Sequence, residues 1–416
     1  MNTFSIIFLI TLAAATATRL WLAQRHVNYV AANRASVPRA FSADVDLEAH
    51  RKAADYTVAK SRFSMLAVVF NAVLLLVLTF GGVLQEVYEF TGQYLGSSLG
   101  RGVLFFALLA LLMSVLDIPF ELYRTFVIEE RFGFNKMTPA LYVKDFFVGL
   151  AVSGVLALPF LALLLWLMVA AGGAWWLYAW VAGVAFWLFI QFISPSVIAP
   201  LFNKFSPLEN EDLKQRIEGL LERCGFQSKG LFVMDGSKRS SHGNAYFTGF
   251  GRSKRIVFFD TLVERHDGPE VEAVLAHELG HFKRRHVLKL TLMFAVLGFL
   301  FFWLLGLAKG TPWLFTGLNV SYPASDALVL TLFYLVLPPF LFFLRPMLAA
   351  YLRKNEFEAD EYAAENAPAG DLVRALVKLY KDNASTLTPD PLHSAFYDSH
   401  PPAAVRIARL ERLSKS

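Results

Sequence analysis

Residues 273–281 read Ala273-Val-Leu-Ala-His277-Glu278-Leu-Gly-His281, a His-Glu-x-x-His pattern inside an apolar run with helical periodicity. At a spacing of four residues, His277 and His281 project from one helix face, close enough for both imidazoles to bind one zinc ion. Glu278 lies beside that face, where its carboxylate can accept a proton from a water activated by the metal. The pattern alone leaves a second interpretation open, because His and Glu also meet by chance on solvated helices.

A third ligand is predicted in the segment Lys354-Asn-Glu-Phe-Glu-Ala-Asp-Glu361. Glu356 and Asp360 are again four residues apart, so one helix can offer one carboxylate to the metal and place a second carboxylate behind it. Zinc-bound histidines usually donate their other ring N–H to such an outer acceptor. Two histidines and one glutamate leave a coordination position open, which is typical of hydrolytic sites. The sequence therefore predicts a metalloprotease with one zinc ion per chain, whose ligands are His277, His281 and Glu356.

The composition indicates where such an enzyme resides. Of 416 residues, 56% are hydrophobic and 18% are charged, and the mean hydropathy is +0.46, which is too apolar for a soluble enzyme of this length. The single cysteine, Cys224, excludes an intramolecular disulfide and a cysteine-based metal cage, and we expect it in a core. We therefore expect a membrane protein whose partners are the bilayer and a peptide or protein substrate, and not nucleic acid.

Seven long apolar stretches predict seven transmembrane helices. The first is expected to be a retained helix and not a signal peptide, because it lacks a basic start and a plain small-residue cleavage site. The third is short before Asp117 and Pro119, and Pro338-Pro339 predicts a kink in the seventh. The stretches cover residues 4–22, 64–85, 102–118, 146–171, 174–196, 288–308 and 326–348.

The loops between these stretches alternate between basic and nearly neutral. By the positive-inside rule, this alternation predicts that the N-terminus lies outside and that the zinc motif and the C-terminus face the cytoplasm. Short loops and the lack of a C-terminal retrieval signal favour a bacterial inner membrane over the endoplasmic reticulum. We expect four parts: helices 1–5 in 1–199, a cytoplasmic zinc-protease segment in 200–287, helices 6 and 7 in 288–348, and a cytoplasmic segment with the third ligand in 349–416.

The segment 200–287 has the periodicity of a small α+β domain. Residues 208–225 predict a helix that stops at Gly225. The runs that predict strands are 230–234, 244–250 and 254–259, the last two joined as a hairpin by Gly251-Arg-Ser253. A small sheet beside the zinc helix would offer a free edge on which an extended peptide can pair.

Several motifs, in order along nearly all of the chain, resemble those of the integral-membrane zinc-type CaaX prenyl proteases, seven-span endopeptidases that trim prenylated C-termini. Besides the zinc motifs, these are Pro119 with Phe126-Val-Ile-Glu-Glu-Arg-Phe-Gly-Phe-Asn135, then His242-Gly-Asn244-Ala-Tyr-Phe-Thr-Gly-Phe250, and Tyr397-Asp-Ser-His400-Pro-Pro with Arg406. The resemblance implies a mainly α fold in which a ring of seven tilted helices surrounds a large chamber, closed on one side by the zinc domain.

The resemblance also implies roles for single residues. Glu278 is similar to the family's general base, and His400 to a histidine that steadies the oxyanion. Asn244 matches a residue that holds the substrate backbone, and Arg406 a basic residue near the site. Without the resemblance, the sequence predicts only that His400 lies in a surface turn, that Asn244 caps a strand and that Arg406 belongs to a basic C-terminal helix. We therefore predict Glu278 and His400 as catalytic, and Asn244 and Arg406 as substrate-binding.

Two other functions stay open. A membrane quality-control protease, similar to the heat-shock zinc proteases, would share the zinc motifs, although those proteins have fewer spans. A non-catalytic scaffold or transporter with a structural metal is the second alternative, and the open site with Glu278 argues against it. We expect no catalytic role for His242, His286 and His393, and we expect Glu358 and Glu361 to face water. The loop Gly133–Asn135 is expected to shape or latch the chamber mouth, without an assigned chemical role.

Overall fold

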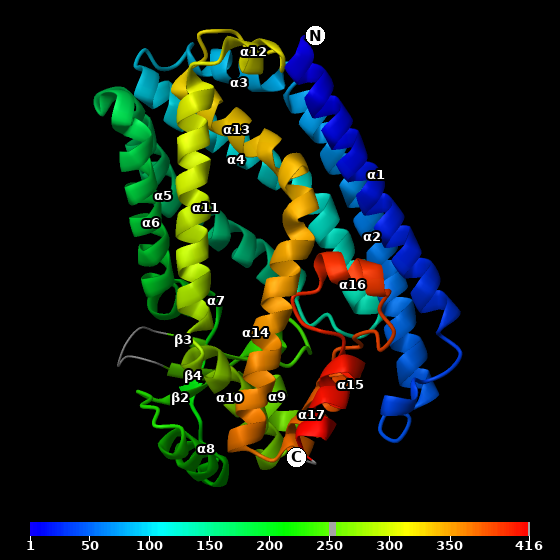
Figure 1. Cartoon of the computed structure of the whole chain (residues 1–416). Coiled ribbons are helices and arrows are strands. Elements are labelled where there is room, and N and C mark those ends of the chain that lie inside the picture. Colours follow the sequence, from blue (N-terminus) through cyan, green and yellow to red (C-terminus); the bar gives the residue numbers. More distant parts are fainter. Residues whose placement is uncertain (249–254, 415–416) are drawn as a thin grey trace.

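The computed structural model describes residues 1–248 and 255–414, and these residues are mainly helical. Within them, seven helices are long and apolar enough to cross a membrane, which confirms the predicted number. Figure 1 shows these helices running between one end of the molecule, near the N-terminus, and a mixed α/β region at the other end. The helices are Thr3–Ala32, Leu47–Leu78, Ser98–Glu129, Pro139–Ala170, Gly172–Phe202, His286–Lys309 and Asp326–Asn366.

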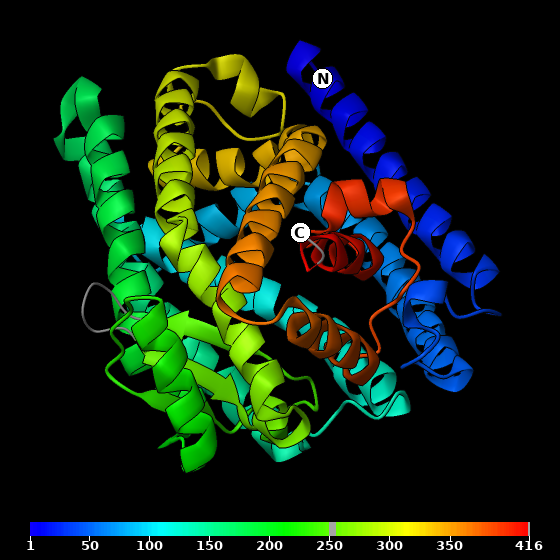
Figure 2. The same cartoon turned by 60° about the horizontal axis from the view of Figure 1, so that its bottom comes forward.

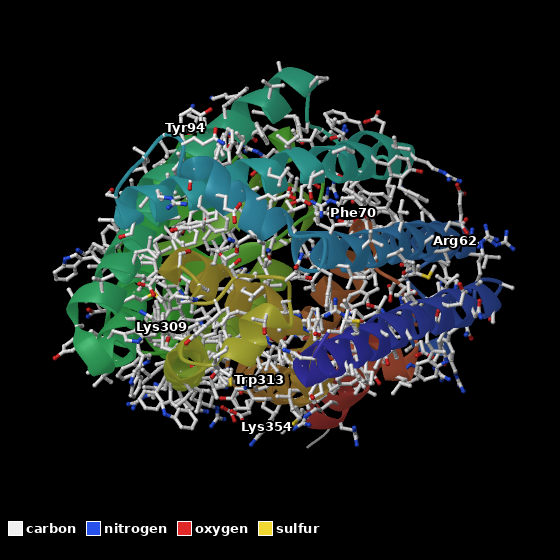
Figure 3. All side chains as sticks on the ribbon, turned by 90° about the horizontal axis from the view of Figure 1, so that it is seen from above. Arg62, Phe70, Tyr94, Lys309, Trp313 and Lys354 are labelled. Carbon is white, nitrogen blue, oxygen red and sulfur yellow. The ribbon has the colours of Figure 1, made fainter. Side chains whose placement is uncertain are left out.

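The two ends of these helices are covered differently. At the N-terminal end, the short helices α3 (Val83–Thr91) and α12 (Pro312–Thr316) lie across the long helices, with Tyr94 and Trp313 exposed on that face (Figure 3). At the opposite end lie the strands and the helices that carry the zinc motifs (Figure 2). The nearly neutral loops thus gather at one end and the basic segments at the other, as the alternation along the sequence requires.

The first helix, α1 (Thr3–Ala32), is an integral part of the fold. Asn2 caps it through a hydrogen bond from the backbone N–H of Ser5, and the Ser5 hydroxyl donates to the carbonyl of Gly317 at 2.6 Å. Phe8 is fully buried in a hydrophobic core that joins the ends of several long helices on the side of the N-terminus. The expectation of a retained first helix agrees with this packing.

Three of the predicted helix boundaries are wrong in detail. The second long helix, α2 (Leu47–Leu78), ends at Leu78, before residue 85, and Gly82, which has a left-handed backbone with φ of 79°, precedes the next helix, α3. The third, α4 (Ser98–Tyr123), continues as an α-helix through Pro119 and passes at Arg124 into a π-helix, η2 (Arg124–Glu129). The seventh, α13 (Asp326–Leu341), passes through a 3₁₀ turn, η6 (Phe342–Leu344), into α14 (Arg345–Asn366).

The remaining long helices have simple bounds. They are α5 (Pro139–Ala170), α6 (Trp175–Ile193) with its extensions η4 (Ser194–Ile198) and α7 (Ala199–Phe202), and α11 (His286–Lys309). Most side chains in the apolar parts of the first six spans are not buried within the protein, and only the seventh is half buried. Many apolar side chains on these helices therefore lie on the outer surface of the protein, as expected for helices that contact lipid. A central chamber stays a prediction.

The small sheet has four strands in the order β1-β2-β4-β3. They are β1 (Phe205–Pro207), β2 (Leu231–Met234), β3 (Ala245–Thr248) and β4 (Arg255–Phe259). β3 and β4 are antiparallel, with Ala245 opposite Phe258, which confirms the predicted hairpin pairing, while its turn at Gly251–Ser253 lies outside the described residues. β2 and β4 are parallel, and β1, which the sequence analysis did not predict, pairs antiparallel with β2. β3 therefore forms one edge of the sheet.

Short helices complete the zinc domain. They are α8 (Glu211–Arg223), α9 (Asp260–Arg265), α10 (Gly268–Lys283), α15 (Ala369–Asp382), α16 (Pro391–Tyr397) and α17 (Ala403–Leu413). α8 stops before Gly225, which has a φ of 61°, and Cys224 is buried in the core below the sheet, as predicted. The division of the chain into four parts stays a prediction, and its boundary at residue 349 falls inside α14.

Candidate metal centre

The two motif histidines lie on α10, whose start is determined by local sequence. Asp267 accepts a hydrogen bond from the N–H of Glu270 at 2.9 Å, and the Glu270 side chain accepts one from the N–H of Asp267 at 3.1 Å. This capping box, with Pro269 in the first turn, fixes where the helix begins. One apolar face of α10 is buried against the domain core, and His277 and His281 lie against α14, with their Nε2 atoms 3.2 Å apart.

Glu356 on α14 brings a carboxylate to the two histidines. Its Oε2 lies 3.5 Å from Nε2 of His277, and its Oε1 lies 3.3 Å from Nε2 of His281. Tetrahedral ligands about 2.0–2.1 Å from a zinc ion are about 3.3 Å from one another, which matches these separations. Oε2 of Glu356 is also buried without a hydrogen-bond donor among the described residues. The three donor atoms therefore fit one zinc ion, as predicted.

Gly280 allows α10 and α14 to approach closely enough to form this site. A Cβ atom at position 280 would lie 2.9 Å from both the Cα and the carbonyl oxygen of Ala359 on α14. Real Cβ atoms do not approach backbone atoms so closely, so a larger residue would push the helices apart. The glycine inside the His-Glu-x-x-His motif thus sets the distance between the histidine pair and Glu356.

Behind His277 lies an ionic arrangement that is almost fully buried. Nδ1–H of His277 donates to Oδ1 of Asp360 at 2.9 Å, and Asp360 has no exposed surface. Arg406 donates to the same carboxylate from Nε at 2.9 Å and from Nη2 at 2.6 Å. Burial alone would lower the pKa of His277, but the carboxylates of Asp360 and Glu356 raise it to about 9. The same negative surroundings favour a divalent cation.

Behind His281 lies a different pair of residues. Nδ1 of His286 is 3.0 Å from Nδ1 of His281, and Nε2–H of His286 donates to Oε2 of Glu358 at 3.0 Å. A metal takes the lone pair on Nε2 of His281, so Nδ1 of His281 carries the proton and donates it to His286. Glu358 is partly exposed, as expected, but it also accepts this hydrogen bond, and His286, for which no catalytic role was expected, is buried beside a zinc ligand.

Sequence reasoning missed this pair because its signal is not periodic. His286 follows a break in which Arg285 has a left-handed backbone with φ of 57°, so helical spacing cannot relate it to His281. Glu361, by contrast, forms an ion pair with Arg409 at the surface of the domain. A histidine placed just after a metal-binding helix is the only sequence signal that could have pointed to His286.

Glu278 lies next to the histidine pair and is only partly buried. Among the described residues, no hydrogen-bond donor and no basic side chain contacts its carboxylate within bonding distance. Burial raises the pKa of Glu278, while the neighbouring imidazoles of His277 and His281 oppose this shift. The result is a carboxylate with an increased affinity for a proton, placed beside the site where zinc fits.

His400 lies in the turn between α16 and α17 and reaches the same site. Its Nε2 is 3.4 Å from Oε1 of Glu356, and its Nδ1 is 3.0 Å from the hydroxyl of Ser399. The side chain is 62% exposed, so its Nε2 side is accessible to a bound molecule. Proline at position 401 holds the backbone before it out of the helical region. The structure thus brings His400 and the three predicted ligands together.

Asn244 and Arg406 have different surroundings. Asn244 is exposed directly before the edge strand β3, and its Oδ1 accepts the N–H of Ala245 at 2.8 Å. Arg406 is 4% exposed, and its guanidinium is occupied by Asp360. Nη1 of Arg406 lies 3.8 Å from Oε2 of Glu356. Asn244 therefore lies where a substrate strand could be reached, whereas Arg406 lies behind the metal ligands.

The loop that contains Gly133–Asn135 contacts the segment that leads into β3. Phe134 accepts a hydrogen bond at its carbonyl from the N–H of Ser241 at 3.2 Å, and its ring stacks on His242 with centroids 4.6 Å apart. Asn135 bridges to Ser240 in an antiparallel arrangement, and Gly133 has a φ of 79°, which allows the tight turn. This loop therefore holds the membrane helices against the strand segment beside the site.

Two family models match the chain, one after the other. The model described as CAAX prenyl protease N-terminal, five membrane helices, matches residues 26–204. The model of peptidase family M48 matches residues 207–414, which include every site residue predicted above.

Curated proteins and one solved structure resemble the chain over most of its length. The chain is 34% identical to CAAX prenyl protease 1 homolog of Arabidopsis thaliana, over 90% of each chain. It is 33% identical to CAAX prenyl protease 1 of Saccharomyces cerevisiae, over 93% of this chain and 91% of that protein. The crystal structure of S. mikatae Ste24p superposes with a TM-score of 0.93 at 30% identity, covering 99% of this chain and all of that one.

Proposed function

Because the chain belongs to peptidase family M48, as a homologue of the CAAX prenyl protease 1 proteins, we propose that it cleaves a peptide bond near the C-terminus of prenylated proteins. The chain is a multi-pass membrane zinc metalloprotease, and its substrates and the roles of its single residues are the subject of the proposal. The observation that carries it is the position of Glu278, whose carboxylate has no partner among the described residues, beside three donor atoms spaced for one zinc ion.

The proposed reaction uses Glu278 as the general base. When bound, zinc supplies a polarised carbonyl and a water of lowered pKa. Glu278 would accept one proton from a water molecule as the water oxygen attacks the scissile carbonyl carbon. Glu278 then gives the proton to the departing amine as the C–N bond breaks, so that the new carboxyl group and the new amine leave separately.

His400 and β3 are proposed to hold the substrate. The exposed Nε2 side of His400 donates a hydrogen bond to the oxyanion that develops on the carbonyl oxygen. The edge of β3 pairs with the extended peptide, and the exposed Asn244 holds its backbone at the start of that strand. Arg406 supports the metal ligands through Asp360, and its contact with the substrate stays a prediction.

We infer that the zinc site faces the cytoplasm and that the N-terminus lies outside. The excess of Lys and Arg at the zinc-domain end supports this orientation through the positive-inside rule. The proposed substrates are cytoplasmic protein tails, which agrees with that side. The curated relatives named above are eukaryotic, and the choice between a bacterial inner membrane and the endoplasmic reticulum stays a prediction.

The decisive experiment compares a farnesylated CaaX peptide with its unprenylated twin, using purified protein of known zinc content. We expect cleavage of the farnesylated peptide, and Glu278→Gln should reduce it roughly 10²- to 10⁴-fold without loss of zinc. Glu264→Gln, on the exposed side of α9, is the matched control and should retain full activity.

Three outcomes separate the alternatives. Equal cleavage of both peptides would favour a broad membrane quality-control protease over a prenyl-specific one. Retained cleavage in the Glu278→Gln variant would contradict the assignment of the base. Bound zinc without cleavage of either peptide would favour a scaffold or transporter with a structural metal.

A further inference from the structure

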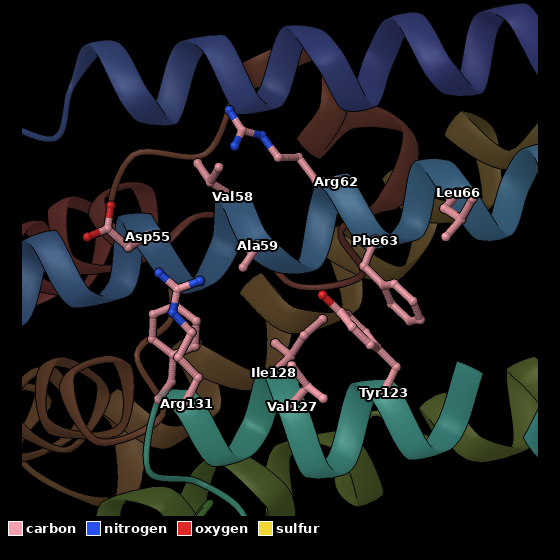
Figure 4. Close-up of a pocket in the computed structure, with 11 residues that line it drawn as sticks. Asp55, Val58, Ala59, Arg62, Phe63, Leu66, Tyr123, Val127, Ile128 and Arg131 are labelled. Atoms are coloured by element: carbon pink, nitrogen blue, oxygen red, sulfur yellow. The ribbon is translucent and has the colours of Figure 1, made fainter. Parts of the chain in front are cut away.

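A pocket of about 700 Å³ lies between α2 and the α4–η2 helix (Figure 4), and no residue of the metal centre lines it. Its walls are mainly apolar, and two arginines and one aspartate line it as well. The residues contributed by α2 are Asp55, Val58, Ala59, Arg62, Phe63 and Leu66. Those contributed by α4, η2 and the following turn are Tyr123, Val127, Ile128, Arg131 and Phe132.

The pocket lies at the depth where two membrane helices change from apolar to polar. The apolar stretch of α2 begins at about residue 64, directly after Arg62, and the third span ends at Glu129, just before Arg131. Phe63 and Tyr123 stack at the same level, with centroids 4.9 Å apart. Aromatic rings and arginines are typical of the boundary between hydrocarbon and lipid headgroups. The pocket therefore opens at the membrane surface on the side of the zinc domain.

The apolar wall of the pocket is exposed although protein surrounds it on several sides. Leu66 is 59% exposed, and Val127 and Tyr123 are nearly half exposed. Figure 4 shows Phe63, Tyr123 and Val127 between the two helices, along their length. A groove that runs along two membrane helices and is lined in this way fits a hydrocarbon chain that lies parallel to them.

The charges of the pocket do not cancel. Asp55 is already neutralised by a bidentate ion pair with Arg34, with both N–O distances 2.7 Å. Arg62 has no hydrogen-bond or ion-pair partner among the described residues, and Arg131 stacks over the ring of Phe132 while its charge also favours the ionised form of Asp55. Figure 4 shows the Arg131 side chain reaching from its own helix toward α2. The pocket thus combines an apolar groove with two guanidinium groups that form no salt bridge among the described residues, and Figure 4 shows that of Arg62 extending from α2 toward α1.

We propose that this pocket binds an anionic glycerophospholipid of the leaflet on the zinc-domain side. The headgroup phosphate lies at Arg131, with Arg62 adding a second positive charge, and one acyl chain lies along Phe63, Val127 and Leu66. Charge complementarity selects an anionic over a zwitterionic lipid. The site is separate from the metal centre, and its occupation does not depend on the function proposed above.

The inner wall of the pocket indicates why occupation matters for the fold. Ile128 and Phe132 line the pocket and also belong to the hydrophobic cluster that holds Phe134 of the Gly133–Asn135 loop. A lipid chain against these two side chains would stiffen the start of that loop, which contacts the segment leading into β3.

The test measures lipid binding to the full-length protein in phosphatidylcholine nanodiscs that contain a minor fraction of phosphatidylglycerol. Native mass spectrometry of the released protein should show one retained phosphatidylglycerol. Arg62→Gln and Arg131→Gln should each reduce its affinity about fivefold, and the double variant about 30-fold. Arg124→Gln is the matched control, because Arg124 lies on the same helix but pairs with Glu121 and does not line the pocket.

Four results would overturn the proposal. They are equal retention of phosphatidylcholine, an equal loss in the Arg124→Gln control, displacement of the lipid by soluble glycerol phosphate, and displacement by a farnesylated peptide. The last would mean that the pocket belongs to the substrate. A further variant, Ala59→Leu, fills the groove while keeping both arginines, and it should also abolish retention if a hydrocarbon chain occupies the groove.

Discussion

His277 and His281 are chemically identical, lie one helical turn apart and face the same carboxylate, yet the groups behind them differ. His277 donates to Asp360, which is itself held by two hydrogen bonds from Arg406, and all three are buried. His281 meets His286 instead, a neutral ring whose other nitrogen donates to Glu358. One half of the metal centre is thus supported by buried charges and the other half by a chain of imidazoles.

The positions of the two halves account for this difference. The His277 half lies between α10, α14 and α17, where a buried carboxylate needs a buried guanidinium. The His281 half lies at the start of α11, where Glu358 is partly exposed and Lys289 and Lys354 approach it at 3.8 Å. Water and surface lysines can therefore stabilise Glu358 after a substitution, whereas no lysine of the described residues pairs with Asp360, which has no exposed surface. We therefore expect substitutions in the His277 half to reduce stability and zinc affinity more than substitutions in the His281 half.

The largest effect is expected from removing the buried cation. Arg406→Met would leave the carboxylate of Asp360 without its main partner in a site with no exposed surface, which costs about 3–5 kcal/mol in the free energy of unfolding. Thermal unfolding of the zinc-loaded protein in detergent measures this loss. Arg409→Met on the same helix is the control, because its ion pair with Glu361 lies at the surface and should contribute at most about 1 kcal/mol. An equal decrease in the free energy of unfolding in the two variants would contradict the claim that burial makes the pairing of Arg406 with Asp360 more important for stability.

The next largest effect is expected on zinc affinity from Asp360→Asn. The amide keeps the shape of the carboxylate but removes the charge that orients and polarises His277 through Nδ1. Substitutions of this kind typically weaken metal binding about 10- to 100-fold. Competition with a chromophoric chelator measures the zinc dissociation constant, and Glu361→Gln, one residue further along α14, should leave it unchanged. An unaltered dissociation constant for Asp360→Asn would show that the charge of Asp360 does not contribute to zinc affinity.

The sequence predicted the metal ligands and Asp360 behind His277, but neither the pairing of Arg406 with Asp360 nor the pair behind His281, for a physical reason. His277, His281, Glu356 and Asp360 are related by a spacing of four on two helices, and helical geometry converts that spacing into a shared face. The seven spans were predictable in number because each must bury about twenty apolar residues in the membrane. Local patterns of this kind also predicted the hairpin of β3 and β4.

Other features depend on tertiary contacts that leave no local pattern. His286 and Glu358 are 72 residues apart and meet only because α11 starts after a left-handed turn at Arg285. Strand β1 is three residues long, and its pairing with β2 depends on the tertiary fold. The third span continues past Pro119 into a π-helical segment at Arg124–Glu129, which no local pattern in the sequence predicted. The pairing of Arg406 with Asp360 likewise depends on how α17 packs on α14.

The smallest effect is expected in the imidazole half. His286→Leu keeps the buried volume but leaves Nδ1–H of His281 without its acceptor, and we expect zinc affinity to fall by about tenfold at most. The loss should be smaller than for Asp360→Asn, because the side chain of His281 is 23% exposed and a water molecule can replace the lost acceptor. Glu358→Gln should have a still smaller effect, since an amide oxygen still accepts from Nε2–H of His286. The same chelator competition ranks the three variants. If His286→Leu weakens zinc binding as strongly as Asp360→Asn, the two halves are equivalent, and buried charge is not what distinguishes them.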